Sequence, residues 1–226
     1  MKVSDAANSR ITCRAFTDKP VSLQQVKQLL EVAKQAPSGG NLQPWEVFAF
    51  TGKKLKAIIE DIESQLDEKP MGEKGEYDVY PPSLWEPYRT RRFKNGEDLY
   101  ACINVGREDK QGRRKQFVRN FRFFDAPVGL FIYIDKGMGP PQWSDVGMFL
   151  QTLMLYAREM GLDTCAQEAW AMWHSIIAKH VQPAKNLMLF CGLGLGYIDN
   201  TFPINSLRTD RVKVDDFTKF YGFENN

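Results

Sequence analysis

The segment WSDVGMFLQTLMLYAREMG at 143–161 constrains the fold most strongly. Its apolar side chains recur at helical spacing, at Val146, Phe149, Leu150, Leu153 and Met154. Ser144 is the expected N-cap of this helix, and Gly161 is its expected stop. A helix that is apolar over most of its circumference has to be covered on several sides. The fold of this chain must therefore place the helix centrally.

The same reasoning predicts the other elements. Ser22 and Gln25 form a capping-box pattern that begins a helix over 22–36. We expect further helices at 53–68, 97–105, 113–124 and 169–181, and strands at 45–50, 126–135 and 186–198. Between 67 and about 96 the periodicity disappears among prolines and aromatic residues, which is typical of a lid. Without repeats or an internal linker, the chain is expected to form one α+β domain over 1–226, with helices around a central mixed sheet.

Composition excludes several classes of protein. The 226 residues are 43% hydrophobic and 26% charged, which is typical of a folded soluble protein. The start MKVSDAANSR has no apolar leader, and the longest apolar run, at 126–134, is too short to cross a bilayer, so we expect a cytoplasmic protein and no membrane partner. The four cysteines form no C-x-x-C pair and the two histidines are six residues apart. Neither a disulfide framework nor a metal site is expected.

The net charge of +2 conceals an uneven distribution. Residues 89–122 contain eleven Lys or Arg residues against four Asp or Glu residues. Such a run is often a solvated helix face. The alternative is a cationic lid that attracts anionic small molecules or the phosphates of a nucleotide. Nucleic acid is not an expected partner, because no recognised nucleic-acid-binding motif accompanies the basic residues.

Two motifs predict a ligand site. In SRITCRAF at 9–16, extended backbone points Arg10, Thr12 and Arg14 to one side, where they would form a site for a phosphate or another dense anion. The alternative is a set of surface arginines near a terminus. In APSGGNLQPW the paired glycines expose backbone N–H groups, and Asn41 and Gln43 add amides that suit the edge of a heterocycle. A turn that only reverses the chain would need the glycines but not this density of amides.

Two other stretches are less informative. GLGLGYID at 192–199 resembles a dinucleotide-binding loop, but no amphipathic helix follows it, so its glycines are interpreted as close packing in a strand. No G-x-S-x-G motif occurs, which removes the main support for a hydrolase.

Glu168 is either a general acid or base, or a residue that serves a helix N-terminus. In the second case the N–H groups of Glu168 and Ala169 would point toward a ligand.

Together SRITCRAF, APSGGNLQPW, GLDTCAQEAW and LRTDR, in this order, resemble the nitroreductase family of flavoproteins, and in particular the branch that acts on nitrobenzenes and nitrobenzoates. The resemblance implies a nitroreductase-like α+β fold, an intertwined homodimer, and one FMN in each of two sites at the interface. It also implies that the middle of the chain, at about 67–121, is a lid-like insertion, and that the apolar tail at about 202–226 lies on the partner subunit.

The resemblance also assigns roles to single residues. Arg10, Thr12 and Arg211, with Arg208, would hold the FMN phosphate, and Arg14 would lie near the N1/O2 edge of the flavin. The partner subunit would supply Ser38, Gly39 and Asn41, and the backbone at Glu168 and Ala169 would donate to flavin N5. Asn120 is the choice for the pyrimidine edge, with Arg119 and Arg122 as competitors. The expected cofactor-binding set is Arg10, Ile11, Thr12, Arg14, Pro37, Ser38, Gly39, Asn41, Asn120, Gln167, Glu168, Ala169, Arg208 and Arg211.

The implied activity is an NAD(P)H-dependent reduction of nitroaromatic compounds, in two-electron steps through nitroso to hydroxylamine, by a ping-pong mechanism. FMN carries the chemistry, so no catalytic amino acid is assigned, although Arg14 and the Glu168 backbone would tune the flavin. The aromatic residues expected to line the substrate slot are Tyr80, Trp85, Tyr88, Phe117, Phe121 and Phe124. The alternatives are reductive dehalogenation of halotyrosines within the same superfamily and a non-catalytic polyanion-binding protein. The residues do not distinguish NADH from NADPH.

Overall fold

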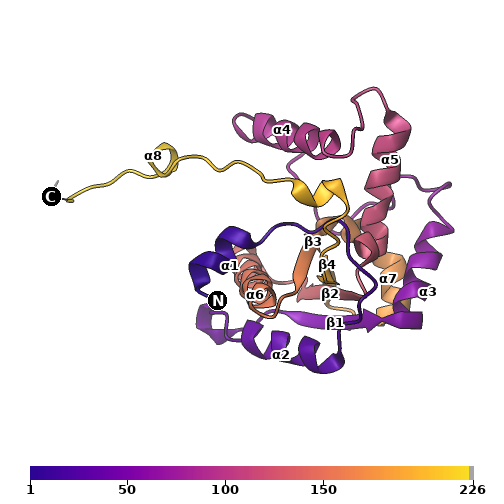
Figure 1. The fold of residues 1–226 in the computed structure, drawn as a ribbon. Helices are drawn as coiled ribbons and strands as arrows, with labels where there is room; N and C mark the ends of the chain where they lie inside the picture. The colour runs from indigo at the N-terminus through magenta and orange to yellow at the C-terminus, as the bar shows by residue number, and fades with distance from the viewer. Residues whose placement is uncertain (224–226) are drawn as a thin grey trace.

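A computed structural model describes residues 1–223 of the chain. Its centre is a four-stranded sheet in the order β1-β2-β4-β3 (Figure 1). The strands are β1 (Glu46–Thr51), β2 (Val128–Asp135), β3 (Asp163–Gln167) and β4 (Leu187–Gly196). All three strand pairs are antiparallel, so the expected mixed sheet is corrected. Among the described residues, parallel pairing is limited to the isolated bridge between Thr12 and Thr164, where the N-terminal segment runs beside edge strand β3.

Helices cover both faces of this sheet (Figure 1). The helices of the described residues, including those that do not lie on the sheet, are α1 (Val3–Ser9), α2 (Leu23–Ala33), α3 (Gly52–Glu63), α4 (Tyr88–Ala101), α5 (Lys110–Val118), α6 (Pro140–Glu159), α7 (His174–Val181) and α8 (Val214–Phe217). Leu130 and Ile132 of β2 belong to a buried cluster with α2 and α6, whereas Phe131 and Tyr133 belong to a cluster with α3 and α7. Side chains alternate along a strand, so the apolar run of β2 supplies both layers of the core.

Helix α6 confirms the expected buried helix but begins earlier than predicted. Its N-cap is Gly139 and Pro140 opens its first turn, so the prediction of Ser144 as N-cap is wrong. Proline is favoured at the first helical position because its missing N–H needs no partner there. The hydroxyl of Ser144 instead donates to the carbonyl of Pro141 at 2.6 Å. Gly161 has φ +71°, the left-handed conformation that commonly ends a helix, as expected.

The lid region differs more from the expectation. Helix α4 begins at Tyr88, inside the stretch expected to be irregular, and ends at Ala101 instead of 105. Its apolar periodicity is weak, and side-chain pairs such as Lys94 with Asp98, at 2.5 Å, support the helix instead. Two further expected helices are each divided in the structure. The helix expected at 113–124 becomes α5 followed by the 3₁₀ turn η2 (Arg119–Asp125). The helix expected at 169–181 becomes the 3₁₀ turn η3 (Glu168–Trp173) followed by α7.

The division of both predicted helices follows from packing. Phe123 and Phe124 have φ of 50° and 54°, an uncommon conformation for bulky residues. It lets η2 insert its phenylalanines into the core, where Phe123 stacks on Trp170 of η3 with ring centroids 4.1 Å apart. Tertiary packing therefore overrides the local helical preference.

The C-terminal segment leaves the body of the protein after the 3₁₀ turn η4 (Pro203–Ser206). Figure 1 shows it reaching far from the sheet, with only the short helix α8 along its path. Its apolar side chains are exposed, including Phe217, Phe220, Tyr221 and Phe223. No helix among residues 1–223 is long and apolar enough to span a membrane.

Candidate functional site

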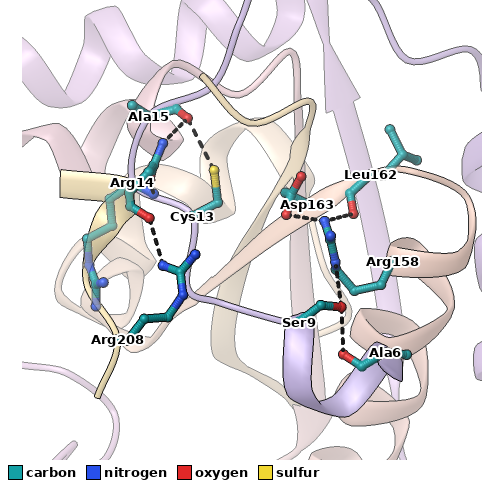
Figure 2. A network of polar contacts seen from close by, with 10 residues as sticks. Ala6, Ser9, Cys13, Arg14, Ala15, Arg158, Leu162, Asp163 and Arg208 are labelled. Carbon is teal, nitrogen blue, oxygen red and sulfur yellow. Dashed lines mark hydrogen bonds and ion pairs between the residues drawn. The ribbon is translucent and has the colours of Figure 1, made fainter. Parts of the chain in front are cut away.

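The N-terminal segment and the start of the C-terminal tail are tied together by one buried amide. Asn205 accepts a hydrogen bond from the backbone N–H of Arg14 at 2.8 Å. Its Nδ2 donates to the carbonyls of Ala15 at 2.9 Å and Asp199 at 2.8 Å. Figure 2 shows how this part of the chain brings Arg14 and Arg208 near one another. No sequence pattern indicates Asn205, because two of its three partners, Arg14 and Ala15, are backbone groups about 190 positions away.

This connection builds a cavity of about 430 Å³ from segments at opposite ends of the chain. Its lining includes four predicted phosphate-binding residues, Arg10, Thr12, Arg208 and Arg211, together with Ile11 and Arg14. No carboxylate is among the described residues that line it. Burial and the nearby charge of Arg211 lower the pKa of Arg10. Like charges gathered without a carboxylate make this cavity suitable for an anion.

A second cavity, of about 420 Å³, lies at the end of β3. The backbone there passes through Gln167, Glu168 and Ala169, all predicted cofactor-binding residues. Thr12 and Arg14 line this cavity as well as the first, so the two cavities adjoin at these residues and together are called the hollow. Cys165 also lines it, but complete burial raises the pKa of its thiol to about 12. A thiol that stays protonated is a poor nucleophile, so Cys165 is not assigned a role in the chemistry.

Asn120 faces this hollow and is held by the core. Buried Gln167 donates through Nε2 to the Asn120 carbonyl at 2.9 Å and to its side-chain oxygen at 3.2 Å. The Asn120 amide nitrogen donates to the carbonyl of Phe117 at 2.8 Å. The two competing residues are paired elsewhere, Arg119 with Asp125 at 2.9 Å and Arg122 with a carboxylate of α3. Asn120 is therefore the one of the three that lines the second cavity.

A third cavity, of about 920 Å³, lies beneath α4 and shares Arg14 with the other two. Of the six aromatic residues predicted for the substrate slot, Tyr80, Phe117 and Phe124 line both this cavity and the second one. Trp85 and Tyr88 lie outside the cavities described here and pack edge to face on each other, with centroids 5.5 Å apart.

Phe121 requires a correction. It has no exposed surface and packs against Phe117, Trp170 and Trp173. It therefore supports the wall from behind and does not form the wall. Its position in a 3₁₀ turn, with neighbours at positive φ, directs it into the core.

The loop at 37–41 lies elsewhere in the same chain. Its residues form the 3₁₀ turn η1 (Gly39–Asn41) beside the first half of α6. The N–H of Gly39 donates to the buried carboxylate of Asp145 at 3.2 Å. None of Pro37, Ser38, Gly39 and Asn41 is among the residues that line the three cavities. A single copy of the chain thus does not bring this predicted part of the site to the hollow.

Comparison with known proteins identifies the family of this chain. A model of the nitroreductase family matches residues 7–197. The chain belongs to this family. It is 36% identical over 218 residues to chloronitrobenzene nitroreductase from Comamonas testosteroni, with 96% of each chain covered. It is also 36% identical over 219 residues to 4-nitrobenzoate reductase from Pseudomonas putida, with 96% of this chain and 94% of the relative covered.

The fold of the chain also matches a solved structure closely. The chain matches the crystal structure of the FMN and NADPH-dependent nitroreductase NfnB from Sphigopyxis sp. strain HMH with a TM-score of 0.95. The two are 41% identical, and the match covers 99% of this chain and 100% of the other. The nitroreductase-like fold expected from the four motifs is therefore confirmed.

Proposed function

We propose that this chain is an FMN-dependent NAD(P)H oxidoreductase that reduces nitroaromatic compounds in two-electron steps. The observation that carries the proposal is the hollow formed by the two adjoining cavities. It has carboxylate-free arginines at one end and the β3 backbone and Asn120 at the other. An anionic tail and a flat heterocycle with polar edges match these two ends. The named relatives are nitroarene reductases, and the similar structure is FMN- and NADPH-dependent.

The residues present fit FMN by the chemistry of their donors. Arg10, Arg208 and Arg211 supply guanidinium groups, and Thr12 adds a hydroxyl, for the phosphate. The guanidinium of Arg208 is oriented by the carbonyls of Asn205 and Leu207, at 2.9 and 3.0 Å. These contacts hold the phosphate-binding end in place before a ligand arrives.

At the other end, the chain's own groups would orient and tune the ring. When bound, FMN supplies hydride acceptance from NAD(P)H and hydride donation to the nitroarene. Arg14 lies between the cavities as a fixed cation, which would favour negative charge on the reduced ring. Asn120 offers an amide to the ring edge, and backbone N–H groups at Glu168 and Ala169 offer donors. Phe124 and Tyr80 provide apolar walls for a flat substrate.

The proposed working unit is a homodimer. The loop at 37–41 carries the predicted ring-binding residues Ser38, Gly39 and Asn41 but does not reach the hollow of its own chain. The exposed aromatic tail also lacks a surface to cover within the protomer, with Tyr221 83% exposed. A second copy would explain both features, with the loop completing the partner's site and the tail lying on the partner.

The activity is tested on protein purified from flavin-rich cells. We expect yellow material that releases FMN on denaturation, that loses its visible flavin absorbance with NAD(P)H under nitrogen, and that regains it with a nitroarene. Comparing turnover of 4-nitrobenzoate with that of 3-iodotyrosine separates the proposed activity from dehalogenation. Flavin-free protein, or flavin that NAD(P)H does not reduce, would contradict the proposal.

The shared site is tested by complementation. One chain carries Arg10→Gln and Thr12→Ala, and the other carries Gly39→Asp and Asn41→Ala. If each site uses both chains, the co-expressed pair regains an intact site that neither parent homodimer has. Recovery to about a quarter to a half of wild-type FMN per chain supports a two-chain site, whereas no recovery in a verified heterodimer contradicts it. This outcome is independent of the substrate panel.

A further inference from the structure

The large cavity beneath α4 has an excess of positive charge that FMN binding does not explain. Five guanidinium groups line it, those of Arg14, Arg89, Arg92, Arg107 and Arg113. Of the residues within 1–223 that line it, Glu97 is the one with a carboxylate. A cavity of this size and charge lies beside the predicted flavin edge, where a substrate would enter.

Two of these cations are already paired. Arg113 forms a bidentate contact with Glu97, at 2.9 and 3.1 Å, which neutralises the one carboxylate of the cavity. Arg89 donates to Glu86 at 2.7 Å. Arg92, in contrast, has no carboxylate oxygen within 4.0 Å among the described residues. The positive charge of the cavity that no carboxylate compensates therefore lies on the remaining arginines and not on all five.

Arg92 is the cation best placed to meet a substrate. Its guanidinium carbon lies 4.2 Å from the ring centroid of Tyr80. Arg92 and Tyr80 line both the large cavity and the cavity at the end of β3, so the pair lies where the two cavities adjoin. In the part of the chain that the structure describes, Arg107 also has no carboxylate oxygen within 4.0 Å. It lies over Phe93 at 5.2 Å, however, and of the three cavities it lines only the large one.

We propose that Arg92 is a specificity-determining residue that binds a compact oxyanion on a molecule occupying the slot. The proposal rests on the proposed FMN-dependent activity and deepens it. The oxyanion is either a carboxylate on the arene or the extra phosphate that distinguishes NADPH from NADH. Stacking on Tyr80 restrains the side chain while leaving the N–H edges of the guanidinium free to donate in a bidentate manner.

The arene arm of the test uses matched probes. Arg92→Gln is compared with Arg91→Gln, a neighbour on α4 that lies over Tyr88 and does not line the large cavity. The measurement is the ratio of KM for 4-nitrobenzoate to KM for 4-nitrobenzamide in FMN-loaded protein. If the arene carries the oxyanion, this ratio rises about 10- to 100-fold in Arg92→Gln, as expected for loss of a charge-assisted contact. It stays at the wild-type value in Arg91→Gln.

A binding measurement accompanies the kinetics. Calorimetric titration of benzoate and benzamide into the same proteins measures the discrimination without turnover. The dinucleotide arm compares KM for NADPH with KM for NADH, and a selective rise for NADPH assigns the oxyanion to the phosphate. Arg92→Lys keeps the charge but not the bidentate geometry, and should restore part of the discrimination in whichever arm responds.

The outcomes separate this inference from the function beneath it. A change in either ratio that the control does not share supports the role of Arg92. Equal changes for charged and neutral probes, or no change in either arm, would overturn it while nitroarene turnover stays intact. If the wild-type protein holds FMN but reduces neither nitroarene, the proposed function fails. The benzoate and benzamide titration then still decides whether Arg92 binds the carboxylate of an arene, and the same titration with NADP⁺ and NAD⁺ decides whether it binds the extra phosphate.

Discussion

Adding one methyl group at Gly192 should damage both the core and the site. A Cβ atom on Gly192 would lie 2.2 Å from Cδ1 of Trp170, far inside van der Waals contact. Trp170 has no exposed surface and stacks on Phe123, so its ring cannot move aside freely. Overpacking of this kind lowers stability by about 1–3 kcal/mol. For a chain of this length, the melting temperature should fall by about 2–12 °C in Gly192→Ala.

Displacement of the Trp170 indole should also disturb the hollow, through hydrogen bonds. The indole nitrogen of Trp170 donates to Gln167 at 3.4 Å, and Gln167 in turn holds Asn120. Gln167 also pairs with Gly192 across the β3 and β4 strands. Moving the indole should therefore loosen the end of the hollow where the ring is proposed to bind. We expect weaker FMN retention in addition to the lower melting temperature.

The assay is thermal unfolding by circular dichroism, with and without added FMN, together with fluorescence titration of FMN. Gly106→Ala is the matched control, because a Cβ there meets nothing within 4 Å. A Gly192→Ala protein that melts with the control would refute the packing argument. If it melts lower but binds FMN as tightly as the control, the path through Gln167 is refuted while the packing argument stands.

Three further perturbations test other parts of the structure. Asn205→Leu should lower stability by about 2–3 kcal/mol and weaken FMN binding, because backbone groups at three positions lose their partner; unchanged FMN affinity would contradict its clamping role. Burial raises the pKa of Asp163 despite its contact with Arg158 at 2.5 Å, so its contribution to stability falls as pH rises from near 4 through the raised pKa. As the pH rises over this range, the Asp163→Asn protein should therefore gain stability relative to wild type. Thermal unfolding measures this, and melting temperatures of the two proteins that change in parallel with pH would contradict the expectation. In alkylation at pH 8 followed by mass spectrometry, half-exposed Cys102 should react well before buried Cys165, and equal labelling would contradict the assigned burial.

Local sequence signals predicted the elements whose stabilising contacts are local. The capping box of α2 is present, with the Ser22 hydroxyl accepting from the Gln25 N–H at 3.2 Å and the Ser22 N–H donating to Gln25 at 2.9 Å. Strand β2 was recognised because its run is buried on both faces. Strand β3 was missed, since it is five residues long, lies at an edge and has polar residues at both ends.

The candidate site also combines features that local sequence patterns predict with features that depend on tertiary packing. Alternation along extended backbone placed Arg10, Thr12 and Arg14 beside one another, which the shared cavity lining agrees with. The burial of Phe121 was not foreseen, because it depends on the turn geometry of η2 and the position of Trp170. The place of Arg92 over Tyr80 also depends on a helix whose start the sequence did not indicate.

The sequence by itself therefore determined the central helix, the two buried strands and the character of each end of the hollow. These follow from periodicity and side-chain chemistry, which act over a few neighbouring residues. No local pattern predicts that arginines almost 200 positions apart line one cavity, or that the loop at 37–41 does not reach it. The family resemblance implied both, and the tertiary structure brings them about. Such convergence depends on a buried amide, Asn205, whose hydrogen bonds join distant backbone and leave no periodic trace in the chain.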